Sequence, residues 1–148
     1  MRETTDFRRW VIRKLDGEGC WTECYEPRRG GGTGIADIQV AVNGVLVPIE
    51  LKVGVVEFGL VYPREVRADQ LGWHNRLNDN AGVMSLFLTG VEGGDGKLVG
   101  CFACGLRPML FWKKGILIAD GAMFDKENFG SLFFAYMVDR LKEWKGEK

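Results

Sequence analysis

The chain has 148 residues, of which 46% are hydrophobic and 27% are charged; this composition is typical of a globular domain and excludes a coiled coil or an intrinsically disordered protein. Its 20 basic and 20 acidic residues give a formal net charge of +0, so composition alone offers no attraction to nucleic acid or to a membrane. No apolar run approaches the roughly 18 residues of a membrane span, and the charged start of the chain does not resemble a signal peptide. We therefore expect one domain over 1–148, located in the cytoplasm.

Hydrophobic periodicity predicts a chain that alternates between helices and strands. Apolar residues at helical spacing predict helices over 5–15, 67–79 and 129–144. Apolar and β-branched segments bounded by turn residues predict strands over 20–26, 35–42, 45–53, 83–89, 98–104 and, more briefly, 116–119. This order of elements indicates an α/β fold with a mixed sheet and helices on its faces.

The four cysteines form two closely spaced pairs, Cys20/Cys24 and Cys101/Cys104. Together they could supply the four thiolates of a zinc site. No histidine accompanies them, and each pair lies in an apolar, strand-like segment, so buried and reduced cysteines are the favoured interpretation.

Two other features allow more than one interpretation. Arg28 and Arg29 precede the glycine-rich stretch 30–34, and they are either ordinary exposed charges or phosphate contacts. The glycines lack the Lys-Ser/Thr ending of a P-loop, so nucleotide binding is not expected. The apolar stripe of the last helix either packs on the sheet, which we favour, or binds a partner protein.

The hairpin over 35–53 carries the most informative chemistry. Asn43-Gly44 is a strong two-residue turn signal, so Val42 should pair with Val45. The register that follows from this pair brings Asp37 opposite Glu50 on the neighbouring strand. Like charges in that arrangement destabilise a sheet by up to about 1 kcal/mol, and a bound cation would offset the repulsion.

Period-2 alternation places four polar side chains on one face of the hairpin, namely Asp37, Gln39, Glu50 and Lys52. Mg²⁺ is commonly held by one or two carboxylates together with phosphate oxygens, so the face is a candidate metal site. The alternative is a polar, solvated face on which Lys52 neutralises Glu50 and Asp37 points into water.

The spacing of Asp37 and Glu50-Leu51-Lys52 on adjacent strands, after a first helix, resembles the PD-(D/E)xK nuclease superfamily. With Gln70 near the start of the next helix, the pattern is most similar to the VRR-NUC and Holliday junction resolvase-like branch. The resemblance covers about 3–104 and implies a restriction-endonuclease-like αβββαβ core, with 106–148 as a C-terminal helical extension.

The resemblance also implies roles for individual residues. Asp37 and Glu50 correspond to metal ligands, joined by the backbone carbonyl of Leu51. Lys52 corresponds to the lysine that orients the attacking water, and Gln70 to the helix glutamine beside that lysine.

Further site residues are expected around this centre. Glu3 is favoured over Asp6 as an additional acidic ligand from the first helix, because Asp6 could equally cap that helix. Arg28, Arg29 and His74 are candidate DNA contacts, although His74 lies beside an aromatic residue and packing is an alternative for it.

The implied activity is a Mg²⁺-dependent DNA endonuclease, with Mn²⁺ as a substitute, which leaves 5′-phosphate and 3′-hydroxyl ends. The expected substrate is a Holliday junction or other branched DNA, cut by a homodimer whose two-fold symmetry suits symmetric cleavage. Such a small nuclease would suit DNA repair or a phage. The alternatives are a restriction or repair nuclease on linear DNA and a catalytically silent module that binds nucleic acid or protein.

Overall fold

The computed structural model describes residues 6–24 and 36–144 of the chain. The helices are α1 (Arg8–Gly17), α2 (Ala68–Asn75) with its π-helical continuation η2 (Arg76–Asn80), α3 (Leu106–Met109) and α4 (Phe129–Glu143), and a 3₁₀ turn, η3, spans Ile118–Asp120. The strands are β1 (Trp21–Cys24), β2 (Ile38–Val42), β3 (Val45–Glu57), β4 (Leu60–Pro63), β5 (Leu86–Glu92), β6 (Leu98–Cys104), β7 (Ile116–Leu117) and β8 (Ala122–Asp125).

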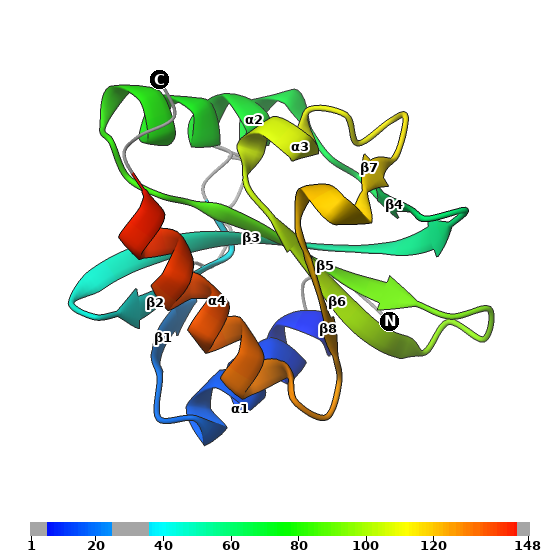
Figure 1. The fold of residues 1–148 in the computed structure, drawn as a ribbon, viewed down its shortest axis with the longest axis horizontal. Coiled ribbons are helices and arrows are strands. Elements are labelled where there is room, and N and C mark those ends of the chain that lie inside the picture. Colours follow the sequence, from blue (N-terminus) through cyan, green and yellow to red (C-terminus); the bar gives the residue numbers. More distant parts are fainter. Residues whose placement is uncertain (1–5, 25–35, 145–148) are drawn as a thin grey trace, which may run out of the picture.

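A single mixed sheet organises these elements in the order β1-β2-β3-β5-β6-β8 (Figure 1). The central pair β3 and β5 is parallel, and the other neighbours along this path are antiparallel. The long strand β3 also pairs with β4, which in turn pairs with the short β7. The predicted α/β fold with a mixed sheet is therefore confirmed.

The hairpin of β2 and β3 has the predicted register. Val42 pairs with Val45 across Asn43-Gly44, whose φ angles of 50° and 80° are the positive values that a type I′ turn requires. Pairing continues down the ladder as far as Ile38 and Ile49. Asp37 thus lies one residue before the first paired residue of β2, at the end of the ladder rather than within it.

The two faces of the sheet are covered by different helices. Helices α1 and α4 pack on one face, over the inward side chains Ile38, Val40, Ile49, Leu51 and Val53. Helices α2 and α3 lie on the other side (Figure 1), over a second core cluster that includes Phe87, Phe102 and Cys104. Alternation along β3 places Glu50 and Lys52 on one face, as the sequence predicts. In the structure this face is turned toward α2, and both residues are buried there rather than solvated.

The segment 106–148, expected as an extension, contributes to the same sheet over its described residues. Strand β8 pairs with the edge of β6, and α4 packs against α1. The apolar stripe of α4 is core, with Phe129, Phe133 and Met137 fully buried. Among the described residues, no helix is long and apolar enough to cross a membrane.

Candidate active site

Asp37 fastens the end of β2 to the adjacent strand. Its carboxylate oxygen Oδ2 accepts a hydrogen bond from the backbone N–H of Leu51 over 2.8 Å. Continued pairing would give Leu51 a backbone partner at Ala36, but the β2 ladder stops at Ile38. Because an unpaired backbone donor is costly, the side chain of Asp37 takes the place of the missing strand. This places the carboxylate at the backbone of the residue that follows Glu50.

Glu50 is buried between β3 and α2, with 1% of its surface exposed. The side-chain amide of Gln70 donates through Nε2 to Oε2 of Glu50 over 3.2 Å. The other carboxylate oxygen, Oε1, lies 3.5 Å from Nε2 of His74. Gln70 and His74 are one helical turn apart on α2, so both face the carboxylate from the same side. The structure therefore brings Gln70 to the carboxylate of Glu50.

His74 belongs to a buried polar chain that extends from Glu50 into the protein. Its Nδ1 lies 2.7 Å from the hydroxyl oxygen of Ser85, which donates to Asn78 over 3.2 Å. Burial and the nearby charge of Lys52 lower the pKa of His74 to about 3, so the ring is neutral at physiological pH. With 0% of its surface exposed, His74 cannot make the direct DNA contact that we predicted for it. The prediction of a DNA contact at His74 is therefore wrong, and the residue instead makes a buried contact with Glu50.

Lys52 is also buried, with 1% of its surface exposed. Its ammonium group donates to the backbone carbonyl of Glu65 over 3.0 Å. Glu65 has a φ of 59°, a left-handed conformation that is strained for a residue other than glycine. Such strain is often found at functional sites, where the surrounding structure holds it in place. Lys52 is thus held by the backbone of Glu65 on the face of β3 that also carries Glu50.

Arg67 is a charge at this site that the sequence analysis did not identify. It precedes α2, and its guanidinium donates to Asp69 over 3.0 Å. That hydrogen bond, together with the charges of Asp69, Glu50 and Asp37, raises the pKa of Arg67. Arg67 therefore adds positive potential beside the two carboxylates. In the sequence, only its position three residues before Gln70 could have indicated that Arg67 lies at this site.

Three predicted site residues, Glu3, Arg28 and Arg29, lie outside the described residues. The four cysteines do not form the alternative zinc site. Cys101 and Cys104 are buried in the core clusters on opposite faces of the sheet, and Cys24 is exposed.

The donor chemistry of the site suits a hard divalent cation. Within the described part of the chain, no group of three or more histidine, cysteine, aspartate or glutamate side chains could hold a metal. A cation here would rely on Asp37, Glu50, a backbone carbonyl and water, which is the oxygen-rich, water-retaining coordination that Mg²⁺ prefers. The bond from Leu51 uses one of about four lone-pair positions of the Asp37 carboxylate, so coordination capacity remains. The residues present therefore fit Mg²⁺.

The sheet order and the flanking helices define a mixed α/β fold. A similar solved structure is Hjc, a Holliday junction resolvase from the archaeal hyperthermophile Archaeoglobus fulgidus. The two chains share 13% sequence identity at a TM-score of 0.50, and the match covers 78% of this chain and 96% of Hjc. No protein-family model matches the chain, and no curated protein sequence is significantly similar to it.

Proposed function

We propose that this protein is a metal-dependent endonuclease that hydrolyses phosphodiester bonds in DNA. The observation that carries the proposal is the placement of Asp37, at 2.8 Å from the backbone of Leu51, beside the buried Glu50 and Lys52 of β3. The fold shared with Hjc supports the same conclusion. In this proposal, Mg²⁺ is held by Asp37, Glu50 and the carbonyl of Leu51, and Mn²⁺ can substitute for it.

When bound, Mg²⁺ would supply an acidified water and would neutralise charge on the scissile phosphate. The chain's own residues do the positioning. Gln70 fixes one oxygen of Glu50, and His74 packs against the other. Lys52 offers ammonium N–H donors to the attacking water or to the developing phosphate charge, from a site that excludes bulk water.

The proposed substrate is branched DNA, with the Holliday junction as the first candidate, because the similar solved structure is described as a Holliday junction resolvase. A homodimer would present two such sites related by a two-fold axis, which matches the symmetry of a four-way junction. Linear duplex DNA is the alternative substrate.

The test is a cleavage assay with the purified full chain on labelled four-way junction, 5′-flap and linear duplex DNA. Each substrate is incubated with Mg²⁺, Mn²⁺ or a chelator. Variants Asp37→Asn and Glu50→Gln are run beside the parent, with Asp139→Asn as a matched control because Asp139 is an exposed carboxylate on α4. We expect metal-dependent cutting that both site variants lose and the control keeps.

The relative rates on the three DNA substrates identify the preferred structure. Equal cutting by the parent and Asp37→Asn would show that the proposed site does not perform the chemistry. DNA binding without cutting of any substrate would instead indicate a catalytically silent module.

A further inference from the structure

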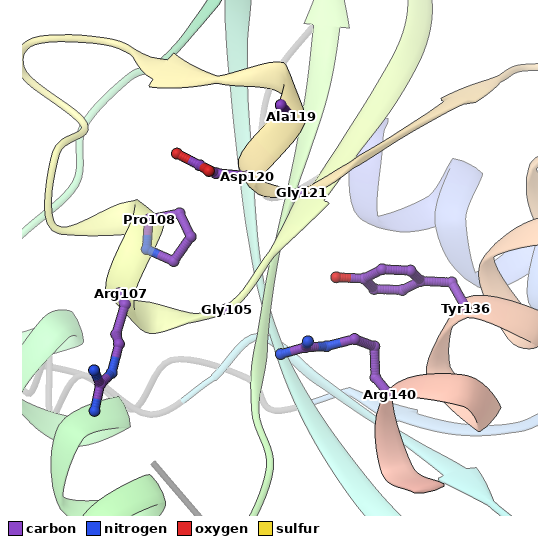
Figure 2. A pocket seen from close by; sticks show the side chains of 8 residues that line it. All are labelled: Gly105, Arg107, Pro108, Ala119, Asp120, Gly121, Tyr136 and Arg140. Atoms are coloured by element: carbon purple, nitrogen blue, oxygen red, sulfur yellow. The ribbon is translucent and has the colours of Figure 1, made fainter. Parts of the chain in front are cut away.

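A cavity of about 350 Å³ opens where β6 ends, between α3, the 3₁₀ turn and α4 (Figure 2). This volume lies at the lower end of the range of small-molecule pockets and suits a group about the size of a nucleotide. Its lining includes Gly105, Arg107, Asp120, Gly121, Tyr136 and Arg140. None of these residues belongs to the proposed active site.

Two donors from one face of α4 point into this cavity. Tyr136 and Arg140 are four residues apart, so their side chains extend from the same side of the helix, and Figure 2 shows both reaching from α4 toward Gly105. The Nε atom of Arg140 is buried and has no hydrogen-bond partner. A methyl group added to Gly105 would lie 3.8 Å from a terminal guanidinium nitrogen of Arg140, so the backbone of Gly105 is close to this side chain.

The electrostatics of the cavity favour an anion. Burial raises the pKa of Tyr136, so its hydroxyl stays protonated and can donate. Burial raises the pKa of both Tyr136 and Cys104, whereas the positive charge of Arg140 lowers it. The guanidinium of Arg140 therefore lies near both groups. Arg107 adds a second positive charge to the lining and extends toward α2 in Figure 2. Two negative charges oppose them. Glu143 of α4 acts on Tyr136 and raises its pKa, and Asp120 belongs to the lining, although it is exposed and its carboxylate points away from Tyr136 and Arg140 in that view.

The cavity lies at the same end of the sheet as the proposed active site. Glu50 pairs with Phe87, and Phe87 pairs with Cys104, the residue directly before Gly105. Two strand spacings, about 10 Å, therefore separate Glu50 from the start of the cavity. A DNA strand advances about 3.4 Å per nucleotide along its axis, so 10 Å corresponds to two or three nucleotides.

We propose that Arg140 and Tyr136 form a binding site for a phosphate group of the nucleic-acid strand, two or three nucleotides from the phosphate that is cut. The planar guanidinium and the phenol hydroxyl are donors suited to phosphate oxygens. The phosphate-binding role stands on the cavity itself, and only its distance from the cut rests on the proposed function. Inorganic phosphate or a free nucleotide would offer the same chemistry.

The test measures binding of a labelled DNA duplex by fluorescence anisotropy in chelator, over a series of salt concentrations, so that no cleavage is needed. Each phosphate contact contributes about 0.9 to the slope of log K against log salt. We expect Arg140→Gln to reduce this slope by about 0.9, whereas Arg13→Gln, which removes an exposed charge of α1 that does not line the cavity, leaves it unchanged.

Two further variants guard against misfolding of Arg140→Gln, and circular dichroism checks the fold of each variant. Arg140→Lys keeps the positive charge and loses the planar guanidinium with its paired donors. The salt slope should therefore stay the same, and the affinity for DNA should fall. Tyr136→Phe removes only a hydroxyl and should weaken binding by up to about tenfold. Isothermal titration with inorganic phosphate tests the second source of the ligand.

The outcomes separate this inference from the proposed function. Slopes and affinities equal to the parent in Arg140→Gln and Tyr136→Phe overturn the site, even if the protein cuts DNA. A heat of phosphate binding that is lost in Arg140→Gln, combined with an unchanged salt slope for DNA, would overturn the nucleic-acid assignment. The ligand of the site would then be a free phosphate or phosphate ester. A reduced slope in a protein that never cuts DNA supports the phosphate site and counts only against the proposed activity.

Discussion

Gln70 connects the start of α2 to the buried carboxylate of Glu50. Its amide nitrogen donates to Glu50 over 3.2 Å, while its amide oxygen accepts the backbone N–H of Arg67 over 3.1 Å. One side chain thus satisfies an N–H at the beginning of the helix and fixes a carboxylate on the central strand. The orientation of the proposed metal ligand therefore depends on where α2 begins.

Removal of this connection should weaken both stability and catalysis. Gln70→Ala leaves the buried carboxylate of Glu50 with one donor fewer, and a hydrogen bond to a charged group contributes about 2 kcal/mol. We expect the free energy of unfolding to fall by about that amount and the Mg²⁺ concentration for half-maximal cleavage to rise. Urea unfolding and a Mg²⁺ titration measure the two effects. The chain's other glutamine, Gln39 on β2, provides the control in Gln39→Ala; equal losses in both variants would contradict the role of Gln70.

Lys52 should matter for the cleavage rate more than for metal binding. Lys52→Met keeps most of the side-chain volume and removes a charge that is 1% exposed. The variant loses the hydrogen bond from the ammonium to the backbone carbonyl of Glu65, so we expect the free energy of unfolding to fall by about 1–3 kcal/mol. Loss of a preorganised donor at a developing charge typically costs about 10²–10³ in rate, and we expect cleavage to fall by that factor. Calorimetry should show Mg²⁺ binding close to that of the parent, whereas a parent-like cleavage rate would remove Lys52 from the mechanism.

The residues that local rules govern were predictable from the sequence. Asn43-Gly44 determined the hairpin register, and alternation along β3 placed Glu50 and Lys52 on one face. Long-range pairing was not predictable: β4 and β8 are four-residue strands whose patterns are too short to recognise, and β8 forms by pairing with β6. The short helix α3 has too few residues to show a helical period.

The candidate site shows the same division. Asp37 and Glu50 followed from the register, but the burial of His74 depends on α2 lying over the sheet, which its own sequence does not reveal. His74 was therefore assigned to a DNA contact when it belongs to the buried chain with Ser85. The cavity at Arg140 was also missed, because it forms between segments that are distant in sequence.

Acid should destabilise the protein through His74. Its pKa is about 3 in the folded chain and about 6.5 when unfolded, so below pH 6.5 the unfolded state binds a proton that the folded state does not. The stability present above pH 6.5 is thus lost as the pH falls toward 3. Between pH 7 and pH 5 the parent should lose about 2 kcal/mol more than His74→Gln. Urea unfolding in chelator measures this difference; parallel pH profiles for the two proteins would contradict the neutral, buried ring.

The cysteines should react at very different rates with a thiol reagent. Cys24 is exposed, whereas burial raises the pKa of Cys101 and Cys104 and keeps both as unreactive thiols. We expect fast modification of Cys24, slower modification of the half-buried Cys20, and reaction of Cys101 and Cys104 only after unfolding. Mass spectrometry after timed quenching resolves the four sites. Reaction of Cys101 or Cys104 in the folded protein as fast as that of Cys24 would contradict their burial.

Two substitutions in α4 test whether its apolar stripe belongs to the core or forms a surface for a partner. Phe133 is fully buried against Phe129 and Phe124, while its neighbour Leu132 is 47% exposed. Phe133→Ala should lower the free energy of unfolding by about 3–5 kcal/mol, the usual cost of such a cavity. Leu132→Ala should change it by no more than about 0.5 kcal/mol, as exposed substitutions usually do. The stripe is core if thermal and urea unfolding separate the two variants in this way. Equal, small effects would mean that Phe133 is not packed in the isolated chain, and α4 would then become the candidate surface for a partner.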